Sequence, residues 1–155
     1  MSLKAKVVLV LISAYFIMHL FGYKILISNT ESLPYKVFLQ TSNKEFKTGN
    51  IVTFEYQFEN YFKYTQGSNF TKIIGCSQGQ RIFKINNTFY CDGAFLGTAL
   101  TKDGKGNDIK SVEIDNEVIP YGKYFMIGTN PKSYDSRYFG YVNEKDIKGV
   151  TYGIF

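Results

Sequence analysis

A nearly continuous apolar run at residues 7–23 constrains this chain more than any other feature of its sequence. A helix over this run spans roughly 25 Å, which approaches the thickness of a bilayer core. With the amine of Lys24 extended to the membrane surface, residues 25–27 lengthen the apolar span further. A secretory signal peptide has a shorter apolar core and a small-x-small cleavage site, which residues 22–29 do not clearly contain. We therefore expect an uncleaved transmembrane anchor over residues 7–27.

The basic residues that flank the run indicate its orientation. Lys4 and Lys6 precede it, and positive charge favours the cytoplasmic side, so we expect residues 1–6 to be cytoplasmic. Residues 28–155 then form a domain outside the cytoplasm. Lys24 lies on the far side of the run and acts against this orientation.

The composition favours β-structure for the domain and argues against nucleic-acid binding. Lys plus Arg is 18 and Asp plus Glu is 13, a net charge of +5, but the basic residues are scattered along the chain. This pattern indicates that the basic side chains lie on solvated faces, where anionic lipid can interact with them, and do not form a nucleic-acid interface. The 13 Tyr and 14 Phe residues favour strands, and the 14 Gly residues indicate many turns.

Short strands separated by turns account for most of the domain. Their residue types predict strands at 35–41, 51–57, 70–76, 81–85, 88–91, 111–114 and 124–128. Asn86 and Asn87 predict a hairpin between two of these strands. Residues 101–108 predict a loop, and residues 58–68 fit either a short helix or a surface flap. The expected fold class is mainly β, a barrel-like domain behind one N-terminal transmembrane helix.

The cysteine and histidine residues do not suggest a metal site. Cys76 and Cys91, the two cysteines, form no Cys-x-x-Cys pair, and the only histidine, His19, lies inside the apolar run. We therefore expect no metal and no cofactor. The two cysteines are either buried free thiols or a disulfide, and their number alone does not separate these states. A domain outside the cytoplasm favours the disulfide, which would stabilise the fold by about 3 kcal/mol.

A polar turn at residues 29–34, Asn-Thr-Glu-Ser-Leu-Pro, follows the apolar run and contains Ser32. Most Ser-x-Pro turns carry no chemistry. A serine hydroxyl is a weak nucleophile until a base accepts its proton. Because His19 lies in the apolar run, a histidine-based triad is excluded, and lysine is the remaining common base for Ser32.

Lys72 is the candidate for that base. On a strand over residues 70–76, the side chains of Phe70, Lys72 and Ile74 point to one face. A lysine between two apolar neighbours is buried if that face packs on the core, and burial lowers the pKa of its amine toward neutrality. The alternative is an edge lysine that points to solvent while its neighbours pack.

A third polar segment, residues 133–140, combines hydroxyl groups with two opposite charges. Asp135 and Arg137 are two residues apart, so they can form an ion pair or hold the loop backbone. The hydroxyls of Ser133 and Ser136 can hydrogen-bond a buried amine. A structured turn between strands is the simpler interpretation, and it is compatible with a catalytic one.

These segments, in this order behind an N-terminal anchor, resemble the serine/lysine type I signal peptidase family, and in particular its conjugative-transfer (TraF-like) branch. The first is similar to the branch's Asn-x-Thr-x-Ser-x-Pro motif, with Asn29 one residue closer, whereas general signal peptidases have Ser-Met-x-Pro. Residues 49–54 resemble a Gly-Asp-Ile-Val strand, and residues 71–75 a Lys-Arg-hydrophobic-hydrophobic-Gly strand. Residues 133–140 resemble the final Ser-x-Asp-Ser-Arg-Tyr-x-Gly motif.

The chain departs from the family pattern at loop positions and beside the lysine. Gly-Asp pairs appear as Gly49-Asn50 and Gly79-Gln80, a Gly-Asp-Asn appears at 128–130 as Gly-Thr-Asn, and the Arg after the lysine is Ile73. Lys36 stands where the branch often has Gly. None of these changes removes a group that transfers a proton.

The resemblance implies a role for each candidate residue. Ser32 is the nucleophile and Lys72 the general base. The oxyanion hole consists of the backbone N–H of Ser32 and the hydroxyl of Thr30. Ser133 orients the lysine amine. The remaining two residues, Asp135 and Arg137, brace the site.

The resemblance also implies a function: a membrane-anchored serine endopeptidase that removes signal peptides from exported precursors, with a pilin or another conjugative-transfer protein as substrate. Its partners are these precursors and membrane lipid, with no nucleic acid. Its place is the bacterial inner (cytoplasmic) membrane, as a single-pass protein whose catalytic domain faces the periplasm or exterior. The alternatives are a housekeeping signal peptidase I and a non-catalytic anchored assembly protein that retains the fold.

Overall fold

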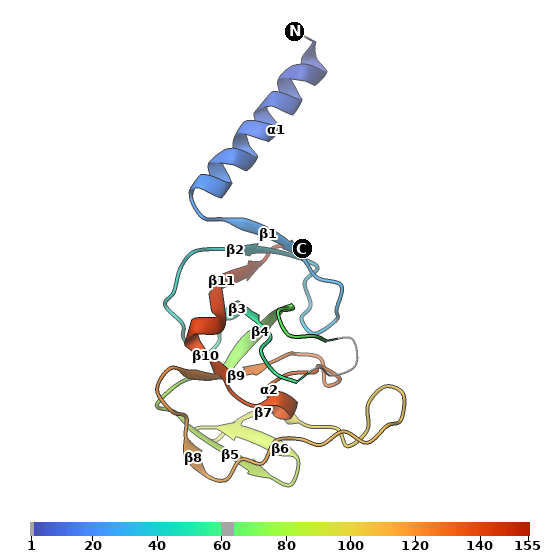
Figure 1. The fold of residues 1–155 in the computed structure, drawn as a ribbon, viewed down its shortest axis with the longest axis vertical. Coiled ribbons are helices and arrows are strands. Elements are labelled where there is room, and N and C mark those ends of the chain that lie inside the picture. Colours follow the sequence, from blue (N-terminus) through green and yellow to red (C-terminus); the bar gives the residue numbers. More distant parts are fainter. Residues whose placement is uncertain (1, 60–63) are drawn as a thin grey trace.

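In the computed structural model, which describes residues 2–59 and 64–155, an apolar helix projects from one end of a β domain (Figure 1). Helix α1 (Leu3–Leu20) is capped at its N-terminus by Ser2, whose hydroxyl accepts a hydrogen bond from the backbone N–H of Ala5. It is the one helix in this described part that is long and apolar enough to cross a membrane. Its 18 residues span about 27 Å.

Gly22 ends the helix and turns the chain into the domain. The N–H of Gly22 donates to the carbonyl of His19 and the N–H of Tyr23 to that of Met18, the paired bonds of a Schellman motif. This motif needs a left-handed residue, and Gly22 has a φ of +73°. Residues 25–27, expected to lengthen the apolar span, therefore do not continue the helix but lie in a strand, Lys24–Ile27.

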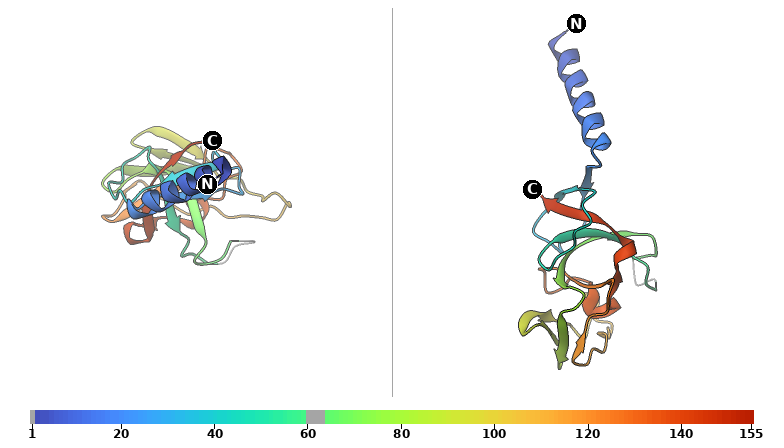
Figure 2. Two further views of the ribbon diagram at one scale, coloured as in Figure 1. Left: turned by 90° about the horizontal axis from the view of Figure 1, so that it is seen from above. Right: turned by 90° about the vertical axis from the view of Figure 1, so that its left-hand side faces the viewer.

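The strands form two antiparallel sheets (Figures 1 and 2). The larger sheet is curved, has the order β1-β2-β11-β3-β4-β9-β10, and consists of β1 (Lys24–Ile27), β2 (Val37–Gln40), β3 (Ile51–Glu55), β4 (Asn69–Cys76), β9 (Lys123–Ile127), β10 (Val142–Asn143) and β11 (Ile147–Gly153). The smaller sheet lies at the end opposite α1, has the order β7-β6-β5-β8, and consists of β5 (Arg81–Ile85), β6 (Thr88–Cys91), β7 (Ala94–Thr98) and β8 (Glu117–Val118). Two short helices complete the domain, α2 (Ser136–Phe139) and the 3₁₀ helix η1 (Glu144–Asp146). The mainly β fold class is confirmed.

Local patterns located several strands well and missed others. The hairpin of β5 and β6 around Asn86 has the expected bounds, and Asn86 adopts a φ of +55°. The predicted strand at 111–114 is wrong: there the N–H of Val112 donates to the carbonyl of Arg137 in an irregular crossing segment. Of the stretch 58–68, residues 60–63 lie outside the described residues, and the rest contains no helix.

Two hydrophobic clusters meet at strands β4 and β9. One contains Phe54, Phe70 and Met126, and the other contains Ile82 and Phe125. A disulfide joins Cys76 at the end of β4 to Cys91 at the end of β6, with their Cα atoms 5.7 Å apart. Strand β4 therefore contributes residues to both clusters, and the disulfide joins it covalently to the smaller sheet.

The loop between β4 and β5 is held by Gln80, an amide at a position where the resembled family has a carboxylate. The side-chain oxygen of Gln80 accepts hydrogen bonds from the N–H of Ser77 and the hydroxyl of Thr48, and its NH₂ group donates to Asp92 at 2.9 Å. These hydrogen bonds keep the connection between β4 and β5 in place.

Candidate active site

Strand β4 presents Lys72 to the interior of the domain. Phe70, Lys72 and Ile74 are all buried on one face, as the strand period predicts, and Lys72 is only 4% exposed. The amine lies 5.7 Å from the centre of the Phe70 ring. Lys72 is therefore not an edge lysine that points to solvent.

Ser32 lies in the loop between β1 and β2, and its backbone is bound to the turn that follows β9. Its carbonyl oxygen accepts hydrogen bonds from the N–H groups of Thr129, at 2.9 Å, and Asn130, at 3.3 Å. The hydroxyl of Thr129 donates to the same oxygen. These bonds hold an otherwise irregular loop against the larger sheet.

The three polar segments meet at the amine of Lys72. Its Nζ donates hydrogen bonds to Oγ of Ser32 at 2.5 Å and to Oγ of Ser133 at 2.9 Å. Ser32 is 8% exposed and Ser133 is 4% exposed, so little water reaches this cluster. A serine hydroxyl therefore lies within hydrogen-bond reach of a buried amine, the geometry that a serine–lysine pair needs for proton transfer.

Burial changes the protonation of Lys72. Burial lowers the pKa of the amine to about 8; the Asp135 carboxylate opposes this shift, and the Arg137 guanidinium adds to it. At pH 7 about a tenth of the amines are then neutral, compared with far fewer for an exposed lysine. The site thus contains an amine that can accept a proton near neutral pH.

Asp135 and Arg137 form a buried ion pair beside the cluster. The carboxylate of Asp135 accepts hydrogen bonds from Nε of Arg137 at 2.8 Å and from the N–H of Gly128 at 2.9 Å. The guanidinium also donates to the carbonyl of Ser133 at 3.2 Å and to that of Thr98 at 2.8 Å. The pair therefore connects the end of β9, the turn that contains Ser133, and β7.

Gly128 lets the two serines approach each other. A Cβ at this position would overlap the side chain of Ser133 and would lie 2.8 Å from the carbonyl oxygen of Ser32. Real Cβ atoms do not make such contacts, so the close packing of both serine segments requires a glycine here.

A family assignment agrees with this arrangement. Residues 2–155 match the family model described as signal peptidase, peptidase S26. The chain belongs to the signal peptidase S26 family. This signal peptidase is a serine-type peptide hydrolase that removes signal peptides from precursor proteins, and its helix α1 indicates a membrane anchor.

Other comparisons add one structural likeness. Comparison of this signal peptidase with curated proteins found no match. The signal peptidase is similar to the crystal structure of a signal peptidase I from Enterococcus faecalis V583, with 22% identity and a TM-score of 0.47. That match covers 70% of this chain and 98% of the other.

A pocket of about 530 Å³ opens beside Ser32 and Lys72. Strand β1 contributes Ile25, Leu26 and Ile27 to its lining, and Thr30 lines it as well. The hydroxyl of Thr30 lies 3.2 Å from that of Ser28, so it points to a neighbour within the same loop. The sequence did not predict that β1 lines this pocket, because its apolar residues resemble an extension of the membrane anchor.

Aromatic side chains form a wall of the signal peptidase pocket that the sequence did not reveal. Tyr64 lines the pocket and stacks on Tyr134, with ring centres 5.3 Å apart, while Phe70 packs edge-on against Tyr64 at 4.9 Å. These residues come from three separate segments. The sequence shows a high content of tyrosine and phenylalanine, but it does not indicate which of these rings contact one another.

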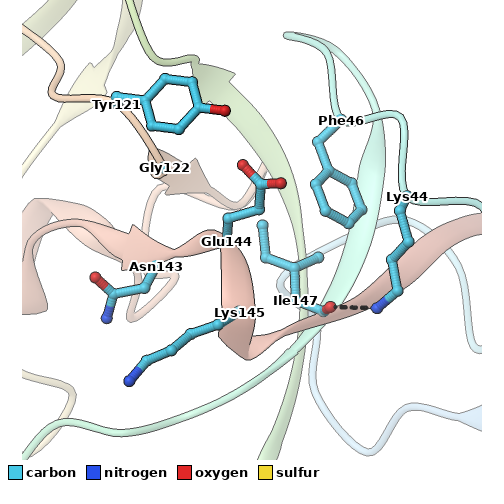
Figure 3. Close-up of a pocket in the computed structure, with 8 residues that line it drawn as sticks. All are labelled: Lys44, Phe46, Tyr121, Gly122, Asn143, Glu144, Lys145 and Ile147. Atoms are coloured by element: carbon cyan, nitrogen blue, oxygen red, sulfur yellow. Dashed lines mark hydrogen bonds between the residues drawn. The ribbon is translucent and has the colours of Figure 1, made fainter.

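A second hollow, between loops and β11, has no serine in its lining and so lacks a serine–lysine pair (Figure 3). One of its two lysines, Lys44, donates to the carbonyls of Ile147 at 2.8 Å and Lys148 at 2.9 Å. The amine of Lys44 therefore binds backbone carbonyls, whereas the amine of Lys72 binds a serine hydroxyl. The residues that line the hollow are Lys44, Phe46, Tyr121, Gly122, Asn143, Glu144, Lys145 and Ile147. Across the described residues, no group of three or more His, Cys, Asp or Glu side chains could hold a metal ion.

Proposed function

We propose that this signal peptidase uses a Ser32–Lys72 dyad to cleave membrane-inserted precursors outside the cytoplasm. The observation that carries the proposal is the 2.5 Å distance between Nζ of Lys72 and Oγ of Ser32. The amine is buried and its pKa is lowered to about 8. Both properties are those that a lysine base requires.

The reaction follows from these two groups. Neutral Lys72 accepts the proton of the Ser32 hydroxyl while Oγ attacks the carbonyl carbon of the scissile peptide bond. The protonated amine then gives its proton to the leaving nitrogen, and the C–N bond breaks to leave an acyl-enzyme. Lys72 next takes a proton from water, which attacks the ester. The released acid and the restored Ser32 hydroxyl complete the cycle.

The oxyanion that forms during each attack needs donors. We assign the backbone N–H of Ser32 and the hydroxyl of Thr30. Among residues 2–59 and 64–155, the N–H of Ser32 donates to no acceptor, so it is free for this role. Thr30 lines the same pocket, and in this proposal its hydroxyl leaves the Ser28 contact to donate to the oxyanion. One such donor lowers the barrier by about 3 kcal/mol.

Ser133, Asp135 and Arg137 support the dyad in this proposal. Ser133 orients the amine of Lys72 through its 2.9 Å hydrogen bond. The ion pair of Asp135 and Arg137 holds the backbone around Ser133 and takes no part in proton transfer.

The substrate segment lies extended beside a strand, with small side chains before the scissile bond. The pocket has an apolar side in β1 and an aromatic side at Phe70 and Tyr64. The Ser32-Leu33-Pro34 turn supports the conjugative-transfer branch, with a pilin or related precursor as substrate.

The proposed location is the bacterial inner membrane, with residues 28–155 in the periplasm or exterior and in contact with lipid. Lys4 and Lys6 before α1 support this orientation. The disulfide between Cys76 and Cys91 agrees with an oxidising compartment. Protease added to intact spheroplasts should degrade the domain, and a protected domain would contradict the orientation.

Two substitutions test the dyad. Processing of precursor should cease in Ser32→Ala and in Lys72→Ala, while Ser111→Ala and Lys47→Ala, at positions outside the pocket, should process at the wild-type rate. Cleavage that persists in both dyad variants would refute the assignment. Incubation of the wild type with a pilin precursor and with a general secretory precursor, followed by mass measurement of the products, distinguishes the conjugative branch from a housekeeping enzyme.

A further inference from the structure

A separate pocket lies where helix α1 joins the domain. It has a volume of about 260 Å³ and is lined by Tyr15, Met18, His19, Tyr23, Lys24, Ile25 and Leu26. Ile25 and Leu26 also line the pocket that contains Ser32 and Lys72. We call the first the joint pocket and the second the catalytic pocket. Strand β1 is therefore a wall common to both.

One face of α1 forms the membrane side of the joint pocket. Tyr15, Met18 and His19 are spaced i, i+3 and i+4, so they share a face of the helix. Met18 is the more covered of the three, and Tyr15 is 60% exposed. Apolar and aromatic surface is thus combined with the polar ends of two tyrosines, a histidine and a lysine.

The chain between helix and strand is held in one shape. The Schellman motif at Gly22 sets the direction of α1, and a Cβ on Gly22 would lie 3.2 Å from the side chain of Ser42. The turn therefore packs directly on the domain. The joint pocket is a feature of this packed turn and not of a loose linker.

We propose that the joint pocket binds the C-terminal end of the apolar membrane helix of the precursor. The inference rests on the proposed function and names a binding site for a different part of the same substrate. The segment before the scissile bond must connect the catalytic pocket to the membrane, and the shared wall at Ile25 and Leu26 gives it a continuous path.

The polar groups of the joint pocket match this ligand. A helix ends with unsatisfied carbonyl groups, which are costly in a membrane and favour nearby cations and donors. Within the part of the chain that the structure describes, the side chains of His19 and Lys24 donate no hydrogen bond. Both are thus available to the last carbonyls of the precursor helix. Lipid tails offer no such acceptors, whereas lipid esters and phosphates do, so crosslinking to lipid is the competing outcome of the test below.

Photocrosslinking tests the contact without requiring catalysis. Full-length protein with Ser32→Ala and a photoreactive phenylalanine analogue at position 18 is reconstituted in vesicles with a precursor. Position 17, at a similar depth on another face of α1, serves as the control. We expect crosslinks from position 18 to the end of the precursor's apolar segment, and at least about tenfold fewer from position 17. Crosslinks to lipid alone, or equal yields from both positions, would overturn the proposal.

A kinetic comparison separates this inference from the proposed function. The ratio of kcat/KM for a full precursor to that for a soluble peptide, which contains only the cleavage site, should fall about tenfold in Met18→Trp. The ratio should stay at its wild-type value in Ile17→Trp. An unchanged ratio in Met18→Trp overturns the joint pocket even if both substrates are cleaved. Failure of the Ser32 and Lys72 variants to affect cleavage overturns the dyad and leaves the crosslinking result to decide the pocket.

Discussion

The amine of Lys72 donates a 2.9 Å hydrogen bond to the hydroxyl of Ser133, which lies 61 residues further along the chain. Ser133 is itself held by its N–H, which donates to the carbonyl of Asn130 at 2.9 Å. The turn after β9 therefore sets where the amine points, although the amine belongs to β4. This relationship makes the geometry at Ser32 depend on a segment that does not line the catalytic pocket.

Removal of the Ser133 hydroxyl should affect turnover rather than binding. Without this acceptor the amine of Lys72 loses its orientation toward Ser32, and we expect Ser133→Ala to lower kcat by roughly 10- to 100-fold. KM should change little, because the side chain is buried and does not line the catalytic pocket. Steady-state kinetics on a cleavage-site peptide measure both. A rise in KM with normal kcat would contradict the positioning role.

The pH dependence should follow Lys72. Its pKa is lowered to about 8 from an ordinary value of 10.5, and only the neutral amine accepts the serine proton. We expect kcat/KM to rise with pH and to level off above about pH 8. A profile of kcat/KM from pH 6 to 11 on a peptide without titratable groups tests this. A midpoint close to 10.5 would show that the amine is not buried during the reaction.

Breaking the buried ion pair should be costly. In Asp135→Asn the guanidinium of Arg137, which is 2% exposed, loses its counter-charge, and the free energy of unfolding should fall by about 3–5 kcal/mol. Denaturant unfolding of the full chain in detergent measures the change. Asp108→Asn is a matched control, because its pair with Lys102 is exposed and should contribute little. Equal losses in the two variants would contradict the importance of burial.

A methyl group at Gly128 should disrupt the site. The added Cβ overlaps the side chain of Ser133 and displaces the loop that contains Ser32, so we expect Gly128→Ala to lower kcat/KM by about 100-fold or more. Gly104→Ala adds the same group where no atom lies within 4 Å and should act like the wild type. Normal activity of Gly128→Ala would mean that the two serines need not pack this closely.

The hydroxyl of Thr30 should matter in the transition state. Thr30→Val keeps the shape of the side chain but removes the proposed oxyanion donor, and turnover should fall roughly 10²-fold with little change in KM. Single-turnover rates on a peptide substrate isolate the acylation step. A wild-type rate would refute the assignment and would leave the Ser28 contact as the function of this hydroxyl.

Much of the site was predictable because its chemistry depends on local patterns. The period of a strand places Phe70, Lys72 and Ile74 on one face, and the absence of a histidine outside residues 7–23 leaves lysine as the base. The hairpin around Asn86 was likewise predictable, because a short turn sets its own register. The strand predicted at residues 111–114 does not form, because Val112 hydrogen-bonds the carbonyl of Arg137 in α2 instead of a neighbouring strand.

The sequence by itself determined the apolar helix, the mainly β domain and the residue types of the candidate site, since each depends on neighbours within a few positions. Only the tertiary structure decided that Ile25 and Leu26 line a pocket, that Tyr64 stacks on Tyr134, and that Cys76 reaches Cys91. It also decided the burial of Lys72, which lowers the pKa of its amine. Burial and pairing depend on which distant segments pack together, and no local pattern of residues specifies that.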